Sequence, residues 1–383
     1  MFAEACPMCG SQQLSEFLHR PAVPVHQNLL MSSRQQARDI VRGDLAMTAC
    51  AACGFVFNAA FDPGLLSYGE SYDNIQGCSS SFQQHLDDLV ALLIDKKGVR
   101  GKQVVEVGCG QGQFLQRLVQ DGENSGVGFD PSYTGAKFLL DGRMRFESRY
   151  YDESCTDVPA DVVICRHVIE HVPDPVALLR SVRAAIGDRG HAKVFFETPC
   201  VEWILRNGVV WDFFYEHCSL FTAASLSSAF QLAGFRVDEV RHIFGGQYLW
   251  LEASPLVSDV EINGEKTFEL ATTYAGHEQA LLQAWKQRIV DLADNGRVAL
   301  WGAGAKGATF ANLIDPECQL IDCLVDLNPN KQGKYVAGSG HAIVDPLKLG
   351  GRGVTDVILM NPNYRDENMK ILKQAGISLN MIE

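Results

Sequence analysis

A short β-branched run that stops at a cluster of glycines constrains the fold of this chain more than any other feature. Residues 103–107 read Gln-Val-Val-Glu-Val, and glycines follow at positions 108, 110 and 112. Apolar side chains at helical spacing resume after residue 113, so the segment predicts a strand, a tight turn and a helix. Glycine tolerates backbone conformations that other residues avoid, and it lets a ligand approach the main chain. We therefore expect an α/β domain with a ligand-facing turn.

Further apolar runs extend this pattern along the chain. Strands are expected at residues 125–130, 161–165, 193–197, 297–302, 320–325 and 354–360, and one or two helices at 264–293. Near-continuous apolar strands that alternate with helices are typical of a parallel sheet covered on both faces. The patterns divide the chain into an N-terminal module (1–65), an α/β core (66–255) and a second, Rossmann-like α/β domain (256–383).

Charge and hydropathy argue against several classes of protein. The 383 residues carry a formal net charge of −13, which disfavours non-specific binding to a nucleic-acid backbone. No run of 18 apolar residues is present, so no membrane span is expected. The first residues lack the basic segment and apolar run of a signal peptide. We expect a cytoplasmic protein with a small-molecule substrate and no nucleic-acid or membrane partner.

Four of the cysteines form two matched pairs. Cys6 and Cys9 form one Cys-x-x-Cys pair, Cys50 and Cys53 form the other, and a glycine follows each pair. This arrangement resembles zinc knuckles, in which the glycine turn lets backbone N–H groups face the thiolates. Four thiolates suit a closed tetrahedral Zn²⁺ site with Zn–S bonds of about 2.3 Å. We therefore predict a structural zinc ion; iron in the same site and redox chemistry of the pairs are the alternatives.

The first glycine turn and the strand ends around it form a candidate cofactor site. Glu106 lies two residues before the first glycine, and Asp130 closes the next strand, where its carboxylate can accept both ribose hydroxyls. The segment 165–175 begins at a third strand end, where open α/β sheets bind ligands. This order resembles class I methyltransferases and implies S-adenosylmethionine (SAM) as cofactor. The expected contacts are Glu106, Gly108, Cys109, Gly110, Gly112, Asp130, Pro131 and His167.

The order of the three blocks resembles one family within that superfamily. A four-cysteine module, a methyltransferase core and a C-terminal α/β domain together resemble the nucleotide-sugar C-methyltransferases. Local matches lie at residues 211–217, 298–307 and 325–335. In that family a 4-keto nucleotide sugar loses the proton next to its carbonyl, and the enolate attacks the methyl group in line. The resemblance implies carbon methylation of a nucleotide sugar.

The resemblance also implies catalytic roles for particular side chains. A general base with a pKa near 7 suits the proton abstraction, and His217 is the candidate. Glu216 is expected to orient this histidine or to hold a substrate hydroxyl, and His171 is a further pocket residue. Tyr68 or Tyr72 is expected to bond the keto oxygen or to line the pocket.

One departure from the family pattern affects this assignment. The family reads Tyr-His-Glu-His where this chain has Phe214-Tyr215-Glu216-His217. The first hydroxyl is lost, and Tyr215 is the candidate for supplying one from the neighbouring position. The identity of the sugar and of the methylated atom depends on this difference.

A second glycine motif opens the C-terminal domain. Gly302, Gly304 and Gly307 match the Gly-x-Gly-x-x-Gly dinucleotide fingerprint, and Asp326 follows about 20 residues later. The pattern alone favours a nicotinamide cofactor, whereas the family resemblance implies that the domain cradles the substrate diphosphate at a helix N-terminus. A purely structural domain is the third possibility. The expected substrate contacts are Tyr72, Gly304, Lys306, Asp326 and Lys331.

Three other functions are compatible with these motifs. The first is O- or N-methylation of another small metabolite, which depends less on removal of a carbon-bound proton. The second is a nicotinamide-binding oxidoreductase that uses the C-terminal domain. The third is a non-catalytic module in which the zinc knuckle recruits a protein or nucleic acid.

Overall fold

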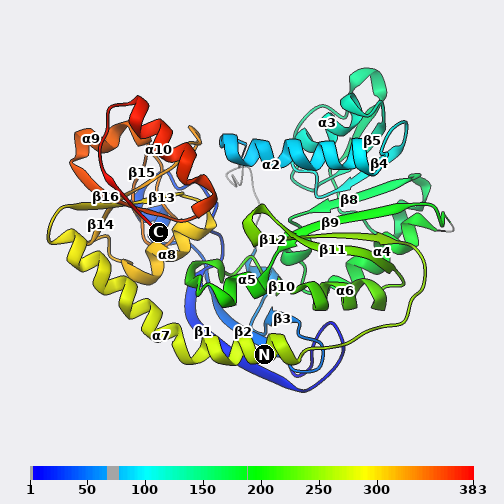
Figure 1. Cartoon of the computed structure of the whole chain (residues 1–383), viewed down its shortest axis with the longest axis horizontal. Helices are drawn as coiled ribbons and strands as arrows, with labels where there is room; N and C mark the ends of the chain where they lie inside the picture. The colour runs from blue at the N-terminus through cyan, green and yellow to red at the C-terminus, as the bar shows by residue number, and fades with distance from the viewer. Residues whose placement is uncertain (1–2, 67–76, 188) are drawn as a thin grey trace.

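The computed structural model describes residues 3–66, 77–187 and 189–383 and arranges them around three β-sheets. A four-stranded sheet contains the N-terminal strands, an eight-stranded sheet forms the core, and a five-stranded sheet forms the C-terminal domain. Figure 1 shows the core and the C-terminal domain as two lobes, with the N-terminal strands and a long helix running beneath them. The molecule therefore has the expected α/β architecture.

The parallel centre of the core sheet is built from the predicted strands. β4 (Gln103–Val107) lies between β8 (Val162–Arg166) and β5 (Ser125–Phe129). β9 (Lys193–Pro199) and β7 (Met144–Glu147) continue the parallel pairing outwards on the two sides. The strands expected at 125–130, 161–165 and 193–197 are thus present, and their carboxyl ends share one edge.

Both ends of this sheet are antiparallel, which the sequence patterns did not predict. β12 (Tyr248–Ser254) pairs with β9 and with β11 (Arg236–Ile243), and β6 (Phe138–Leu139) pairs with β7. Every residue of β12 is buried, so the strand lacks the alternation that marks an antiparallel strand with one wet face.

Helices cover both faces of the core sheet. α2 (Ser80–Ala91) and α3 (Gln113–Asp121) pack on one face, and α4 (Pro175–Ile186) and α6 (Ala223–Leu232) pack on the other. Successive residues of a strand point to opposite faces, so neighbouring valines of β4 enter different apolar clusters. The predicted sheet covered on both faces is confirmed.

The C-terminal sheet is parallel throughout, in the order β15-β14-β13-β16-β17. The expected strands appear at its centre, and two short strands complete its edges. The strands are β13 (Arg297–Trp301), β14 (Ile321–Val325), β15 (Ile343–Val344), β16 (Val354–Leu359) and β17 (Asn380–Ile382). The accompanying helices are α8 (Ala305–Ile314), α9 (Leu349–Arg352) and α10 (Arg365–Gln374).

The N-terminal strands are tied to both other blocks. β1 (Leu14–Pro24) and β2 (Arg42–Cys50) form an antiparallel pair, beside β3 (Val56–Asn58), with the short helix α1 (Arg34–Arg38) between β1 and β2. β10 (Ser219–Leu220), a strand of the core segment, completes this sheet by pairing with β3. The sheet called N-terminal is thus shared with the core.

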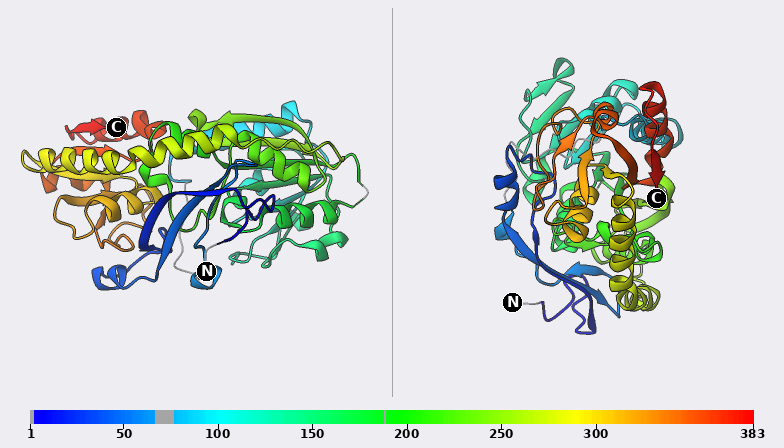
Figure 2. Two further views of the ribbon diagram at one scale, coloured as in Figure 1. Left: turned by 90° about the horizontal axis from the view of Figure 1, so that it is seen from below. Right: turned by 90° about the vertical axis from the view of Figure 1, so that its left-hand side faces the viewer.

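One helix connects the N-terminal strands to the C-terminal domain. Residues 264–293 contain a single 29-residue helix, α7 (Glu265–Ala293), which packs against β1, β13 and α5 (Val201–Arg206). Figure 2 shows it lying along the N-terminal strands and reaching the C-terminal lobe. A buried ion pair, Arg20 Nη2 to Glu278 Oε1 at 2.7 Å, fixes the helix to β1. No helix within the described ranges is long and apolar enough to cross a membrane.

Candidate active site

The four paired cysteines converge on one point. The Sγ atoms of Cys6 and Cys53 lie 3.7 Å apart, those of Cys9 and Cys50 lie 3.6 Å apart, and all four lie within 4.8 Å of one another. A tetrahedron with Zn–S bonds of 2.3 Å has S–S edges of about 3.8 Å. The thiols therefore have the spacing that a closed four-thiolate metal site requires.

The turns and the electrostatics of this cluster also fit a cation. Gly10 and Gly54 adopt positive φ, and their N–H groups donate to the carbonyls of Cys6 and Cys50. Hydrogen bonds from neighbouring thiols lower the pKa of Cys50 to about 2, whereas the bond to Cys50 raises the pKa of Cys6 to about 12. Protein groups alone therefore favour ionisation of one thiol at the expense of the others, and a divalent cation would supply the charge that four thiolates need.

The first glycine turn folds as the sequence predicts. Gly108, Gly110 and Gly112 have φ of +71°, +53° and +78°, in the region that glycine favours. A Cβ atom at position 108 would collide with Val168, and one at position 112 would collide with Phe146. The turn therefore requires glycine both for its conformation and for its close approach to neighbouring side chains.

The two acidic residues beside this turn hold the turn itself. Asp130 Oδ2 accepts from the Gly110 N–H at 2.8 Å, and its Oδ1 accepts from the N–H and hydroxyl of Ser132. Glu106 is buried, accepts from the Leu115 N–H at 3.1 Å, and has its pKa raised to about 8 by burial. A carboxylate has further lone pairs, so Asp130, at the strand tip, keeps acceptor capacity for a ligand, whereas Glu106 fastens the start of α3.

The remaining expected cofactor contacts differ in their surroundings. The Cys109 side chain is buried and its N–H donates to the Phe129 carbonyl at 3.1 Å, while Pro131 is exposed beyond the strand. His167 adopts φ of +53°, a strained conformation for a residue with a side chain. The structure therefore gathers the predicted residues around the carboxyl ends of β4, β5 and β8.

His167 belongs to a buried network of charged groups. Its Nδ1 lies 3.2 Å from Glu170 Oε1, and its Nε2 lies 3.6 Å from Glu197 Oε2. Glu197 also accepts from Arg166 and His85, both at 2.6 Å. Burial opposes protonation of His167, but the two carboxylates outweigh it and raise its pKa to about 9. His167 is thus cationic at neutral pH, at the edge of the cavity.

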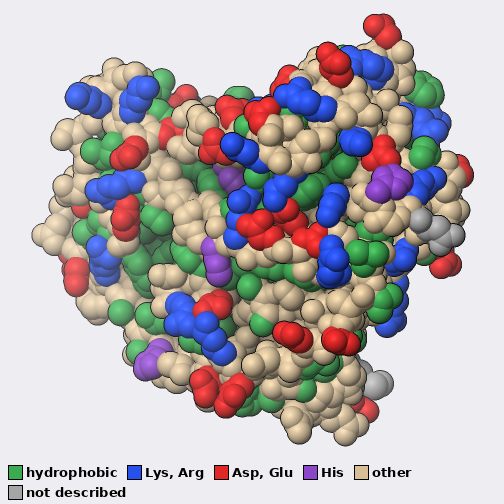
Figure 3. Space-filling view, turned by 45° about the vertical axis from the view of Figure 1, so that its right-hand side comes forward, with side chains coloured by type: hydrophobic (Ala, Val, Ile, Leu, Met, Phe, Trp, Pro, Cys, Tyr) green, Lys and Arg blue, Asp and Glu red, His purple; other side chains and the backbone are tan. Residues whose placement is uncertain are grey.

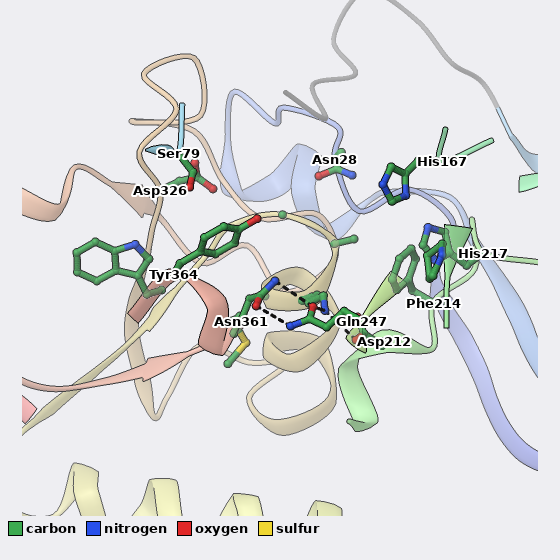
Figure 4. Close-up of a pocket in the computed structure, with 18 of the residues that line it drawn as sticks. Asn28, Ser79, His167, Asp212, Phe214, His217, Gln247, Asp326, Asn361 and Tyr364 are labelled. Atoms are coloured by element: carbon green, nitrogen blue, oxygen red, sulfur yellow. Dashed lines mark hydrogen bonds and ion pairs between the residues drawn. The ribbon is translucent and has the colours of Figure 1, made fainter. Parts of the chain in front are cut away.

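The cavity beyond the carboxyl ends of β8 and β9 lies where the three blocks meet, and it has a volume of about 270 Å³. Of the expected cofactor contacts, only His167 is among its lining residues. It is lined by core residues of the 167–171 and 212–217 segments, by Asn28 of the N-terminal module and by the second glycine turn. Figure 4 shows His217 and Phe214 on one side of this pocket and Asp326 and Tyr364 on the other. Acidic and basic side chains are interspersed over the face in Figure 3, without a broad patch of one sign.

The candidate base lies beside a second histidine. The rings of His217 and His171 are 4.9 Å apart and nearly perpendicular, and Phe214 packs on His217 at 4.0 Å. Burial lowers the pKa of His217 well below its usual value, and the His171 ring adds to this effect. His217 is therefore neutral at pH 7 and can accept a proton.

Glu170 completes a group of three potential metal ligands with these histidines. Its carboxylate and the two imidazoles offer atoms within 4.8 Å of one another. Both Glu170 oxygens, however, already have partners, His167 and the Thr198 hydroxyl. The arrangement therefore favours acid–base chemistry of the histidines.

Two expectations for the 214–217 segment need correction. The Tyr215 hydroxyl accepts from the Asp62 N–H at 2.8 Å, and its fully buried ring packs beside Phe61 and Gly43, away from the cavity. It therefore does not supply the hydroxyl that Phe214 lacks. Tyr68 and Tyr72 lie outside the described residues.

Glu216 faces the cavity but orients a different histidine from the expected one. Its Oε1 lies 3.2 Å from His26 Nδ1, and its Oε2 accepts from the Gln27 N–H at 3.0 Å. The carboxylate is 1% exposed, and these bonds anchor it to the N-terminal module. The prediction that it orients His217 is therefore wrong, while a contact with substrate stays a prediction.

A carboxylate at the end of the following strand also holds the second glycine turn. Asp326 Oδ2 accepts from the Ala303 N–H and Oδ1 accepts from the Asn328 N–H, both at 2.9 Å. Asp130 holds the first turn with the same pair of contacts. Gly302 has φ of +115°, and Gly304 lies directly before α8, so N–H groups at the start of α8 lie beside the cavity.

The two expected lysines both line the cavity, in different electrostatic settings. Lys306 Nζ lies 2.8 Å from Asp212 Oδ2. Lys331 is 4% exposed, and its Nζ contacts only neutral oxygens among the described residues, those of Asn28 at 3.5 Å and Ala303 at 3.4 Å. A buried ammonium without a carboxylate partner marks a place for an anion.

Several cavity residues were missed by the sequence reasoning. Asn28, Gln247 and Asn361 come from three separate segments without any motif. Asp212 could have been predicted, because it lies inside the 211–217 segment and precedes the candidate base by five residues. Asn28, Gln247 and Asn361 could be assigned to the cavity only from the folded structure.

Comparison with known proteins agrees with this architecture. Residues 80–240 match a family model described as "Methyltransferase domain", and residues 258–378 match one described as "C-methyltransferase C-terminal domain". The fold and site thus define a SAM-dependent methyltransferase of the class I α/β type.

A curated relative spans nearly the entire chain. The C-methyltransferase NovU of Streptomyces niveus is 26% identical over 95% of this chain and 91% of its own length. Because this relative and both family models agree, the chain belongs to the C-methyltransferase family.

Other relatives cover smaller parts of the chain. The tRNA U34 carboxymethyltransferase of Campylobacter lari is 31% identical over 27% of this chain and 38% of its own length. The ubiquinone biosynthesis O-methyltransferase of Vibrio campbellii is 32% identical over 26% of this chain and 45% of its own. Among solved structures, magnesium protoporphyrin IX methyltransferase of Synechocystis has a TM-score of 0.36 at 17% identity, covering 49% of this chain and 90% of its own.

Proposed function

We propose that this enzyme transfers a methyl group from SAM to the carbon next to the carbonyl of a keto nucleotide sugar. The observation that carries this proposal is the composition of one cavity. A partly buried, neutral histidine lies on the core side. On the other side, beside a glycine turn, lies a buried ammonium that has no carboxylate partner among the described residues.

The histidine end supplies the proton chemistry. Burial and the neighbouring His171 lower the pKa of His217, so its ring is in the neutral form that removes a carbon-bound proton. Heteroatom methylation has less need for such a base. The pocket chemistry therefore favours carbon as the acceptor.

The glycine-turn end supplies a site for a diphosphate. Lys331 Nζ lies within 3.9 Å of the position that a Cβ of Gly304 would occupy, at the start of the ten-residue helix α8. Helix N-termini and buried ammonium groups both favour phosphate oxygens. Asp326, at the tip of β14, is placed to accept from ribose hydroxyls, so a nucleoside diphosphate fits this end of the cavity.

The cofactor and the metal have separate sites. We assign SAM, which supplies the transferable methyl group on a sulfonium, to the turn of Gly108, Gly110 and Gly112 beside Asp130. We assign a structural zinc ion to Cys6, Cys9, Cys50 and Cys53, whose closed arrangement leaves no position for substrate.

A methylation screen tests the proposal. Purified enzyme is incubated with trideuteromethyl-labelled SAM and dTDP-, UDP- or GDP-linked 4-keto-6-deoxyhexoses, and the products are analysed by mass spectrometry. A second incubation in D₂O without SAM measures deuterium uptake next to the carbonyl. We expect a labelled C-methyl product and exchange with at least one sugar. Labelling of oxygen or nitrogen without exchange, or no labelling of any sugar, would contradict the proposal.

A further inference from the structure

The cavity holds a second ammonium group that has a free donor. Lys306 Nζ lies 2.8 Å from Asp212 Oδ2 and 3.1 Å from Gln247 Oε1. A lysine ammonium has three N–H donors, so two are satisfied and one has no hydrogen-bond acceptor within the described part of the chain. The Lys306 side chain is partly exposed to the cavity, so the third donor is available to a ligand.

The position of this ammonium is fixed from the core side. Asp212 and Gln247 are both buried, and Gln247 is itself held by two hydrogen bonds to Asn361, at 2.8 and 3.1 Å. Figure 4 shows this chain of bonds between the C-terminal domain and the wall that carries Phe214 and His217. Lys306 therefore reaches from α8 across the domain junction towards the candidate base.

The Lys306 ammonium interacts electrostatically with His217. Lys306 is among the groups that hold the pKa of His217 low, after burial and the neighbouring histidines. Burial raises the pKa of Asp212, and the Lys306 ammonium opposes this shift. The ammonium thus lines the same cavity as the candidate base and interacts with it electrostatically.

The two aromatic side chains that directly precede Glu216 offer no donor to an anionic oxygen in the cavity. Phe214 has no hydroxyl, the Tyr215 hydroxyl is bonded to Asp62, and Lys331 lies at the glycine-turn end of the cavity. Buried ion pairs seldom stabilise a protein more than an apolar substitute would, so stability alone gives little reason for Asp212 and Lys306 here.

We propose that Lys306 is the catalytic residue that stabilises the enolate oxygen during carbon methylation, an inference that rests on the proposed function. His217 takes the proton from the carbon next to the carbonyl, and the C–H electron pair forms a C=C bond as the carbonyl π pair moves to oxygen. That oxygen accepts the free N–H of Lys306. The enolate carbon then bonds to the methyl carbon of SAM, the S–CH₃ pair stays on sulfur, and the carbonyl re-forms. His217 later releases its proton to solvent.

The test separates enolate formation from methyl transfer. Deuterium exchange next to the carbonyl is measured in D₂O without SAM, at saturating concentrations of the 4-keto-6-deoxyhexose nucleotide that the wild-type enzyme labels best. Lys306→Met is expected to slow this exchange about 100-fold or more, the effect of removing one oxyanion donor. Lys306→Arg should keep part of the rate. Lys331→Met, the matched lysine of the diphosphate end, should mainly raise the KM for the sugar nucleotide.

A double variant distinguishes a catalytic defect from a folding defect. Lys306→Met leaves the Asp212 carboxylate buried without its partner, whereas Asp212→Asn combined with Lys306→Met removes both charges. We expect the double variant to unfold at nearly the wild-type temperature and still to exchange slowly. A folded double variant that exchanges at the wild-type rate would overturn the inference and leave the proposed function intact. Wild-type enzyme that exchanges no sugar of the set would overturn both.

Discussion

At the scale of single residues, the protonation state of His217, the proposed base, depends on its surroundings. Burial, two neighbouring imidazoles and Lys306 all favour the neutral ring, which lowers its pKa well below the usual value. Because only the neutral ring accepts a proton, the base stays active as the pH falls, until the pH reaches the lowered pKa. An unperturbed histidine would lose half of its activity near pH 6.5 already.

The rate of deuterium exchange should therefore be flat from about pH 8 to about pH 6.5 and fall only at lower pH. His217→Ala should lower the exchange rate by about 100-fold to 10,000-fold, the usual range for a general base. His277→Ala is the control, because His277 is exposed on α7 outside the cavity. Half-maximal exchange at pH 6.5 or above in the wild-type enzyme would contradict the lowered pKa.

Tyr215 allows a complementary prediction, because its hydroxyl serves the backbone of Asp62. Tyr215→Phe should leave kcat within about twofold of the wild-type value. It should cost about 0.5–1.5 kcal/mol of stability, the net worth of a typical hydrogen bond. Urea unfolding and turnover measured on the same sample check both parts. Phe214→Tyr, which adds a hydroxyl inside the cavity, is the contrasting variant; a large loss of kcat in Tyr215→Phe instead would restore a catalytic role.

The direction of these side chains was not predictable from the sequence. The four cysteines and both glycine turns were predicted from the sequence. The spacing of residues within a short segment largely determines their local geometry. Tyr215 and Glu216 contact Asp62, His26 and Gln27, which lie more than 150 positions away. Which neighbour in such a run faces the cavity is decided by those distant partners.

At the scale of elements, long apolar strands were predictable and short ones were not. Central strands of both α/β sheets carry short apolar runs, such as residues 162–165 of β8 and 298–301 of β13, which give a clear local signal. β10 and β15 have two residues each, and each forms by pairing with the edge of a neighbouring strand. β10 nevertheless bears on the proposed site, because it begins two residues after His217, the proposed base.

This placement links the proposed metal site to the proposed base. The β2–β3 hairpin carries Cys50 and Cys53 at its turn, and β3 pairs with β10 through Val56 and Leu220. Cys9→Ser should lose the one zinc ion expected per chain, lower the unfolding temperature and reduce turnover through the displaced His217 segment. Mass spectrometry under native conditions, thermal unfolding and the exchange assay measure the three effects. Cys318→Ser, a partly buried cysteine of the C-terminal domain, is the control. Full zinc content in Cys9→Ser would refute the four-thiolate site.

At the scale of the whole molecule, the active cavity belongs to no single block of the sequence. Asn28, the 167–171 and 212–217 segments and the second glycine turn all line it. Composition suggested boundaries near residues 65 and 255, but β10 completes the N-terminal sheet and α7 fastens that sheet to the C-terminal domain. The sequence pattern shows where one run of strands and helices ends. Sheets shared between blocks and buried ion pairs depend on tertiary contacts, so the pattern does not predict them.

This shared cavity predicts that the C-terminal domain contributes to substrate affinity and not to cofactor affinity. Lys331 is buried and has no carboxylate partner within the described ranges, so its ammonium favours a bound anion. The expected SAM site, in contrast, lies around Asp130 at the carboxyl ends of the core strands. Lys331→Met should therefore weaken binding of dTDP or UDP by about tenfold to 100-fold, equal to about 1.5–3 kcal/mol for a charge-assisted hydrogen bond. Its affinity for SAM should stay within twofold. Calorimetric titration of each ligand measures both values, and Lys348→Met, an exposed lysine of the same domain, should change neither. Equal weakening of SAM and nucleotide, or tight binding of NADH at the second glycine turn, would show that this turn does not hold the substrate diphosphate.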